Sequence, residues 1–516
     1  MNDISKNVRH IMTVFLFLFV GLISYIAYFQ LFKAPEILEM PGNTRVLAEK
    51  NEVLRGNIYD RDGTILATTT RNEDESQTRT YTDGNLFVHP LGYSSKIYGL
   101  SGLEQTYDDT LSNFNMFGNN FRSFLSTIEI KQFVSNIKND FVSTKEFNIK
   151  ENFNEFVENI RVKGLLDESE KIGNGIVTTL DSELQRVANE ALGNNKGAVV
   201  AIDPKSGEIL AMVSKPTYDP NNLEVEITNA NNGEADETPL INRAINGLYP
   251  PGSIFKTVTL ASALENMENV TGRIFEDRGK IEFEDGTSIE NYAGNVYGNI
   301  DLREGYKVSS NVVFGTLAME LGNKNLKDTA EDFGFNSVIK GAGVTVSESK
   351  FPTLEDYEVG NIAQSGIGQG EVVTTPMQMA LVAATVGNNG VMMEPKLVKT
   401  IVDKDKNVVE DIEDERIGRV MERGTAETIQ SYMKYLVDNN IYRWPAFAGT
   451  NAGGKTGTAD YKVNGEDAVP HGWFISVAPM NNPKIAVAVI VENGKSGSGT
   501  AATVASKVVR KAVLGE

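Results

Sequence analysis

The 516-residue sequence contains no cysteine and only three histidines, which are His10, His89 and His471. Without cysteine the chain can form no disulfide, use no thiol nucleophile and hold no cysteine-bound zinc or iron–sulfur cluster. So few histidines make a histidine-rich metal site or a histidine-based catalytic triad difficult to assemble. We therefore expect neither a metal nor a cofactor, and we expect lysine, aspartate, glutamate or tyrosine to carry any proton transfer.

Positive charge is also scarce, because 49 lysine and arginine residues face 69 aspartate and glutamate residues, for a formal net charge of −20. A surface of this sign repels phosphate groups, which argues against nucleic acid as a partner. Hydrophobic residues make up 41% of the chain, which is enough for folded cores and excludes a wholly disordered protein. The length corresponds to roughly three folding units.

Residues 11–32, IMTVFLFLFVGLISYIAYFQLF, contain no charged side chain. About 22 residues in a helix span about 33 Å, which matches the hydrocarbon thickness of a bilayer. Lys6 and Arg9 precede this run, and no clear A-x-A cleavage pattern follows it. We predict a single uncleaved membrane anchor, with residues 1–10 in the cytoplasm and everything after Lys33 outside. No ATP is available there, so the reaction must conserve bond energy or run downhill.

Residues 175–516 begin and end with strand–turn–strand patterns. GAVVAIDPKSGEILAMVSK near the start and WFISVAPMNNPKIAVAVIVEN near the end each read as a hairpin, and long apolar helical stretches lie between them. Because strands from both ends of a domain can share one antiparallel sheet, we predict an α+β architecture for this region.

Residues 33–174 are polar and acidic, and we predict that they form a separate, non-catalytic N-terminal domain. A part of it, from about residue 114 to residue 162, carries many phenylalanines. Their spacing is mostly helical, which favours small-domain helices packing around their own core over an aromatic ligand site.

The segment PPGSIFKTVTLASALE, residues 250–265, places a serine at the predicted start of an apolar helix. Two prolines and a glycine cannot lie inside a regular helix, so the helix should begin at or just after Gly252. Unpaired N–H groups and the helix dipole then favour negative charge near Ser253. Lys256 lies three residues later on the same face, and its neutral amine can take the Ser253 proton to create a nucleophile.

The S-x-x-K spacing alone is weak evidence, because it also occurs at Ser135, Ser337, Ser347 and Ser431. Ser253 differs from these by the rigid proline corner before it and the apolar helix after it. In a second segment, VSSNVVFG, the hydroxyl of Ser309 can relay a proton and the amide of Asn311 can orient a substrate carbonyl.

A third segment, GGKTGTAD, reads as an extended run. Alternation along it places Lys455 and Gly457 on one side and Thr456 and Thr458 on the other. Lys455 and the threonine hydroxyls suit a substrate carboxylate, and the N–H of Thr458 can pair with that of Ser253 to hold an oxyanion.

Residues 449–456 also match the phosphate-binding pattern G-x-x-x-x-G-K-[ST]. That loop needs a buried strand before it and a helix that begins at its lysine. Neither is expected here. The segment YRWPAFAG before the match does not read as a buried strand, and Gly457 after it disfavours a helix that begins at the lysine. We therefore reject a nucleotide-binding site.

The ordered set Ser253-x-x-Lys256, Ser309-x-Asn311 and Lys455-Thr456-Gly457 resembles the S-x-x-K, S-x-N and K-T-G motifs of penicillin-binding proteins and serine β-lactamases. RGNIYDRDGTILA, from Arg55, resembles the opening of the non-catalytic N-terminal domain of monofunctional class B penicillin-binding proteins. The short N-terminal region as a whole resembles that of their compact type A branch. Similar family segments include GLSGLEQTYDDTL, TTLDSELQ, AVVAIDPKSGEILAMVS, NRAINGLYPPGSIFK and SGIGQGEVVTTPMQMA. We recognise no family segment between about residue 113 and residue 173.

The resemblance implies the penicillin-binding transpeptidase fold, which has a central antiparallel sheet flanked by helices and an all-helical subdomain. It also implies a peptidoglycan D,D-transpeptidase that cross-links stem peptides outside the membrane. In that reading Ser253 attacks the penultimate D-Ala and terminal D-Ala leaves, with Lys256 as base and Ser309 as proton relay. Asn311 would hold the donor amide, while Lys455, Thr456, Gly457 and Thr458 would bind the terminal carboxylate. β-Lactams should acylate Ser253, and a SEDS-family glycosyltransferase is the expected partner.

Other functions remain open at this point. A D,D-carboxypeptidase would use water as the acceptor, and the motifs do not separate it from a transpeptidase. The chain could also be a cell-wall scaffold whose catalysis is dispensable. A β-lactamase is disfavoured by the predicted anchor and N-terminal domain, and a β-lactam sensor by the short predicted cytoplasmic tail.

Overall fold

The computed structural model describes residues 53–74, 76–113, 172–232, 238–463 and 465–516, together with isolated positions between residues 15 and 25. Residues 55–70, 78–111 and 173–516 form one compact unit. The other unit lies mostly outside the described residues, as do the predicted anchor at residues 11–32 and the phenylalanine-rich segment. Within the described part of the chain, no helix is long and apolar enough to cross a bilayer.

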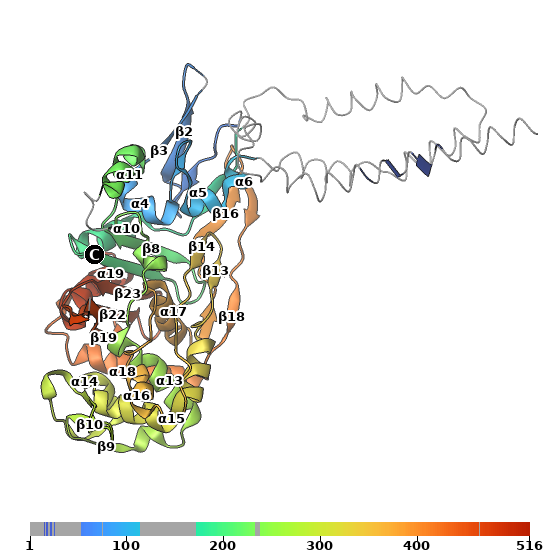
Figure 1. The fold of residues 1–516 in the computed structure, drawn as a ribbon. Coiled ribbons are helices and arrows are strands. Elements are labelled where there is room, and N and C mark those ends of the chain that lie inside the picture. Colours follow the sequence, from blue (N-terminus) through green and yellow to red (C-terminus); the bar gives the residue numbers. More distant parts are fainter. Residues whose placement is uncertain are drawn as a thin grey trace, which may run out of the picture. The chain divides into compact units, whose positions relative to one another are not determined.

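A five-stranded antiparallel sheet lies at the centre of the larger unit (Figure 1). Its strands, in spatial order, are β19 (Gly453–Ala459), β22 (His471–Ala478), β23 (Ile485–Val491), β7 (Gly197–Ile202) and β8 (Ile209–Lys215). Both predicted hairpins are therefore confirmed, and the pairing of β23 with β7 joins the first and last strands in one sheet. β7 and β23 are apolar and buried throughout, because helices cover both faces of the sheet.

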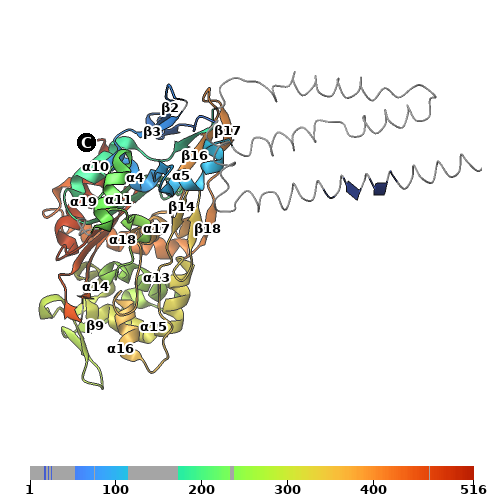
Figure 2. The same ribbon diagram turned by 45° about the horizontal axis from the view of Figure 1, so that its top comes forward.

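Two helices cover one face of this sheet. α10 (Ser182–Leu192) and α19 (Ala502–Leu514) pack against each other and against the sheet, as Figures 1 and 2 show. α10 begins at Asp181, whose carboxylate accepts the N–H of Leu184 at 2.9 Å, a standard N-cap. Leucines, valines and alanines from both helices and the sheet form one buried cluster.

The opposite face is covered by α17 (Pro376–Gly387), every residue of which is buried. Thr375 caps this helix by accepting the N–H of Gln378 at 3.1 Å, and Pro376 occupies its first turn. α18 (Arg423–Asp438) packs against β19, the strand at the edge of the sheet.

The apolar helix that begins at Lys256 belongs to a layer of four helices. The layer consists of α13 (Lys256–Asn266), α14 (Leu302–Val308), α15 (Asn311–Asp332) and α16 (Val359–Gly366), with α15 packed between α13 and α16. The expectation of an all-helical subdomain is too simple. Short strands separate α13 from α14 and pair as two ribbons, β9 (Ile274–Asp277) with β12 (Gly298–Asp301), and β10 (Lys280–Glu282) with β11 (Ser288–Glu290).

A second sheet runs across the predicted domain boundary. Its strands, in spatial order, are β17 (Val408–Asp411), β16 (Val398–Val402), β6 (Gly175–Thr178), β1 (Ile58–Tyr59), β2 (Ile65–Arg71) and β3 (Gln77–Tyr81). β6 pairs in parallel with β1 and antiparallel with β16. The boundary between residues 174 and 175 remains a prediction.

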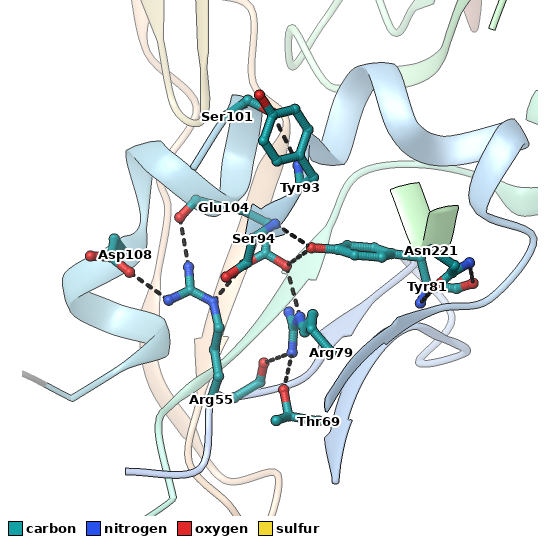
Figure 3. Close-up of polar contacts among 11 residues, drawn as sticks. Arg55, Thr69, Arg79, Tyr81, Tyr93, Ser94, Ser101, Glu104, Asp108 and Asn221 are labelled. Atoms are coloured by element: carbon teal, nitrogen blue, oxygen red, sulfur yellow. Dashed lines mark hydrogen bonds and ion pairs between the residues drawn. The ribbon is translucent and has the colours of Figure 1, made fainter. Parts of the chain in front are cut away.

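A buried ion cluster stabilises the N-terminal part of the larger unit (Figure 3). Glu104, which has no exposed surface, accepts from Arg55 at 2.6 Å, from Arg79 at 2.8 Å and from the hydroxyl of Tyr81 at 3.0 Å. Burial alone would raise the pKa of Glu104, but the two guanidinium groups outweigh it and lower that pKa. The cluster joins β3 (Gln77–Tyr81) to the helix that contains Glu104.

Candidate active site

Ser253 lies on a short 3₁₀ turn, Gly252–Ile254, immediately before α13. Two hydrogen bonds to other segments hold the turn in place. The buried indole of Trp473 donates to Pro250 O at 3.0 Å, and Gly252 N donates to Gly368 O at 2.8 Å. Gly252 has φ +54°, and a Cβ on it would lie 2.2 Å from Thr458 O. Only glycine therefore fits, and the turn that carries Ser253 is pressed against β19.

Lys256 is completely buried. Its Nζ lies 2.7 Å from Ser309 O, 2.7 Å from Asn311 Oδ1 and 3.3 Å from Ser309 Oγ. Desolvation lowers the pKa of Lys256 well below its usual range, and the charge of Lys455 acts in the same direction, whereas Asp277 opposes it. A neutral amine has two N–H donors and one lone pair. The two short contacts use both donors, so the lone pair is left to accept a proton.

Lys455, on β19, is the second buried lysine of the site. Its Nζ donates to Ser309 Oγ at 2.8 Å and to Thr456 O at 2.9 Å, and it lies 5.5 Å from the centre of the Tyr306 ring. Burial lowers the pKa of Lys455 to about 7. The hydroxyl of Ser309 thus lies between two lysine amines that approach it from different elements.

The Ser309–Asn311 turn joins α14 to α15. Ser309 has φ +59°, and Ser310 caps α15 by accepting the N–H of Val313 at 3.0 Å. This turn directs the hydroxyl of Ser309 and the amide of Asn311 toward Lys256.

The exposed edge of β19 carries the remaining predicted residues. Lys455 and Gly457 are buried while Thr456 and Thr458 are half-buried, which confirms the predicted alternation. The N–H and C=O of one strand residue point to the same edge. Since the C=O of Thr458 faces Gly252, its N–H also lies on the side of the Ser253 turn.

The structure brings Lys256, Ser309, Asn311 and Lys455 into one hydrogen-bonded cluster. Among the described residues, no hydrogen bond engages the side chains of Ser253, Thr456 or Thr458. Their assignment as substrate-contacting groups stays a prediction that rests on the position of the turn and of β19.

Two competing patterns have ordinary structural explanations, whereas the one at Ser135 lies outside the described residues. Ser431 donates to Thr428 O at 2.7 Å on the exposed surface of α18, and Lys434 is ion-paired with Asp438. The nucleotide-loop pattern fails as predicted, because its lysine, Lys455, lies within a strand and does not begin a helix.

Sequence reasoning missed Asp277, a fully buried carboxylate beside this turn. Ser310 Oγ donates to Asp277 Oδ2 at 2.5 Å. In β9 the exposed and buried positions alternate, so Asp277 lies on the same inward side as Phe275, but four residues are too few to show this period in the sequence. An acidic residue on the apolar side of a strand is unusual unless it has a role.

Comparison with known proteins is consistent with this geometry. The family described as "Penicillin binding protein transpeptidase domain" matches residues 197–512, and "Penicillin binding protein A dimerisation domain" matches residues 55–131. The chain is 29% identical over 511 residues to the peptidoglycan D,D-transpeptidase PbpA of Mycolicibacterium smegmatis, covering 95% of this chain and 94% of that protein.

Solved structures agree. The D,D-transpeptidase domain of a peptidoglycan glycosyltransferase from Eggerthella lenta has a TM-score of 0.73 at 30% identity, covering 90% of this chain and 99% of that one. The penicillin G acyl-enzyme complex of penicillin-binding protein A from M. tuberculosis has a TM-score of 0.74 at 28% identity, covering 90% and 100%. The predicted transpeptidase fold is confirmed, and the chain belongs to the penicillin-binding protein transpeptidase family.

Proposed function

We propose that this protein is a peptidoglycan D,D-transpeptidase that works through an acyl-enzyme on Ser253. The observation that carries the proposal is the approach of two buried lysines, Lys256 and Lys455, to the hydroxyl of Ser309. Burying two lysine amines away from water costs folding free energy. The arrangement is chemically useful only if one of the amines accepts a proton.

In the acylation step, the lone pair of Lys256 takes the proton of the Ser253 hydroxyl as Ser253 Oγ bonds to the carbonyl carbon of the penultimate D-Ala. The negative charge that develops on the carbonyl oxygen is held by the N–H groups of Ser253 and Thr458. The C–N bond then breaks and terminal D-Ala leaves as an amine. Its nitrogen receives a proton by way of Ser309, whose hydroxyl accepts from Lys455 at 2.8 Å and lies 3.3 Å from Lys256.

In the second step, the amine of a neighbouring stem peptide attacks the ester carbonyl of the acyl-enzyme. Its proton returns by the same route and Ser253 is released. The acyl-enzyme retains the free energy of the donor peptide bond to a large extent, so the cross-link forms without ATP. Asn311 is suited to hold the donor amide, and Lys455, Thr456 and Thr458 are suited to hold its terminal carboxylate. A β-lactam presents a carbonyl and a carboxylate to the same groups and acylates Ser253.

We further propose that residues 11–32 anchor the protein in the cell membrane, with residues 1–10 in the cytoplasm and the catalytic region outside. The support is the uncharged apolar run and the basic residues before it. A location outside the membrane suits an enzyme of the cell wall, and a SEDS-family glycosyltransferase would supply the glycan strands.

Covalent labelling with fluorescent penicillin tests the nucleophile. The full chain in detergent should take up one label, and Ser253→Ala should abolish it. Ser431→Ala is the matched control, because Ser431 has the same S-x-x-K spacing at an exposed position of α18. Labelling that survives Ser253→Ala would refute the mechanism.

Product analysis distinguishes the acceptor. With a stem-peptide donor and an added amine acceptor, a transpeptidase forms the cross-linked dimer and releases D-Ala. Release of D-Ala without any dimer would instead identify a D,D-carboxypeptidase.

A further inference from the structure

Two carboxylates have no exposed surface in the described part of the chain, Glu104 and Asp277. Glu104 is neutralised by Arg55 and Arg79. Asp277 is different, since none of the lysines or arginines that the structure describes forms an ion pair with it. A buried charge without a cation is costly unless hydrogen bonds compensate it, so the contacts of Asp277 indicate what it is for.

The carboxylate of Asp277 is the acceptor in each of its hydrogen bonds. Ser310 Oγ donates to Oδ2 at 2.5 Å, Asn291 Nδ2 lies 2.8 Å from Oδ1 and 2.9 Å from Oδ2, and Gly279 N donates to Oδ1 at 2.8 Å. The Nδ2 of Asn291 and the N–H of Gly279 can only donate, and Ser310 Oγ donates in this arrangement. The arrangement therefore fits an ionised carboxylate.

Both side chains that bond to Asp277 also hold the catalytic turn. Ser310 lies between Ser309 and Asn311 in the sequence. Asn291 Oδ1 accepts the backbone N–H of Asn311 at 2.7 Å. Asp277 thus fixes Ser310 directly and fixes Asn311 through Asn291.

The charge of Asp277 also acts on the amine of Lys256. Desolvation and the charge of Lys455 lower the pKa of Lys256, and Asp277 is the negative group that opposes them. The carboxylate therefore offsets part of the effect that burial and the charge of Lys455 have on Lys256.

We propose that Asp277 is a positioning residue for acyl transfer. Through Ser310 and Asn291, its buried carboxylate holds Ser309 and Asn311 at hydrogen-bonding distance of Lys256. This role rests on the proposed function, because it concerns the geometry of the acylation step. Asp277 itself is not expected to touch the substrate.

The test is the time course of fluorescent-penicillin labelling of the full chain, analysed for the non-covalent dissociation constant and the maximal acylation rate constant. Asp277→Asn keeps the shape and removes the charge and one acceptor. The double variant Asp277→Asn with Asn291→Asp exchanges the carboxylate and the amide between the two positions. The exchange restores the buried negative charge and the lost acceptor, and it keeps an acceptor for the N–H of Asn311. Glu104→Gln is the matched control, because it removes the other fully buried carboxylate.

We expect Asp277→Asn to lower the acylation rate constant about tenfold or more while the dissociation constant changes less than about threefold. The exchanged pair should recover most of the rate, and Glu104→Gln should acylate at the wild-type rate even if it unfolds at a lower temperature. Wild-type acylation by folded Asp277→Asn, or a folded double variant no faster than the single one, would overturn the proposal.

If Asp277→Asn does not fold, Ser310→Ala replaces it, with Thr375→Ala as its control. Both remove a buried helix-capping hydroxyl, but only Ser310 also bonds to Asp277. Slower acylation by Ser310→Ala than by Thr375→Ala supports the proposal, and equal rates overturn it. Labelling of wild type that Ser253→Ala does not abolish would instead refute the proposed function, so the two failures are distinct.

Discussion

Lys455 connects the chemistry of the site to its stability at the scale of a single residue. It has no exposed surface, and burial lowers its pKa from 10.5 to about 7. Near neutral pH the amine can therefore gain or lose its proton. The protonated form suits the capture of a carboxylate, and the neutral form costs less to bury.

The lowered pKa of Lys455 predicts how stability depends on pH. Between pH 7 and pH 10.5 the unfolded chain binds the proton that the folded chain has lost. The contribution of Lys455 to the free energy of unfolding therefore becomes more favourable as pH rises through this interval. Lys455→Met removes that dependence. In urea unfolding, the difference in unfolding free energy, wild type minus Lys455→Met, should increase between about pH 7 and about pH 9. A difference that stays constant or falls would contradict the assignment.

At the scale of elements, the loop Gly366–Gly370 links the parts of the site. Gly368 O accepts from Gly252 N beside Ser253, and Gly366 O accepts from Thr259 Oγ1 on α13 at 2.6 Å. With its amide oriented to satisfy both groups, Gln369 donates to Asp460 O at 3.2 Å and accepts from Asp460 N at 3.1 Å, just beyond the end of β19. The loop thus sets the spacing between the Ser253 turn and β19.

This geometry predicts that Gln369→Leu slows acylation by about tenfold, because β19 is freed to shift relative to Ser253. Gln185 offers a closely matched control. Its amide makes the same two bonds to Met212 on β8, at 2.8 and 2.9 Å, at the other edge of the sheet. Both leucine variants should lose roughly 1–3 kcal/mol of unfolding free energy. Only Gln369→Leu should lower the penicillin acylation rate per folded molecule, and equal rates in the two variants would refute the role of the loop.

Local features of the fold and the sharing of one sheet by its first and last strands could be predicted from the sequence, whereas individual long-range side-chain contacts could not. The hairpins and the caps at Asp181 and Thr375 follow from patterns within a few residues of each other. The pairing of Gln369 with Asp460 joins segments far apart in the chain, and neither segment signals the other. The candidate motifs were found because each is compact, whereas Asp277 lies in an acidic, polar stretch that reads as surface. The ribbons between α13 and α14 were missed because their strands are too short to show a period.

At the scale of the whole molecule, the active-site strand depends on a sheet assembled from both ends of the catalytic region. β7 follows α10 near its start, while β22, β23 and α19 come from its end. α19 packs its buried valines on the sheet face, on the same cluster as α10.

Loss of packing under α19 should therefore affect stability and leave the chemistry intact. Val508→Ala opens a cavity in this cluster and should lower the free energy of unfolding by roughly 1–3 kcal/mol. The acylation rate constant per folded molecule should be unchanged. Lys507→Ala, at an exposed position on the same helix, should alter neither quantity. A large loss of acylation rate in folded Val508→Ala would show that this face of the sheet is coupled to the site.

The nucleophile can be identified directly by mapping the adduct. After brief exposure of the full chain to penicillin G and digestion with trypsin, mass spectrometry should find the acyl group on residues 244–256, AINGLYPPGSIFK, in which Ser253 is the only hydroxyl-bearing residue apart from Tyr249. Fragmentation should place it on Ser253. An adduct on the peptide that contains Ser309, or no adduct on a folded protein, would contradict the account.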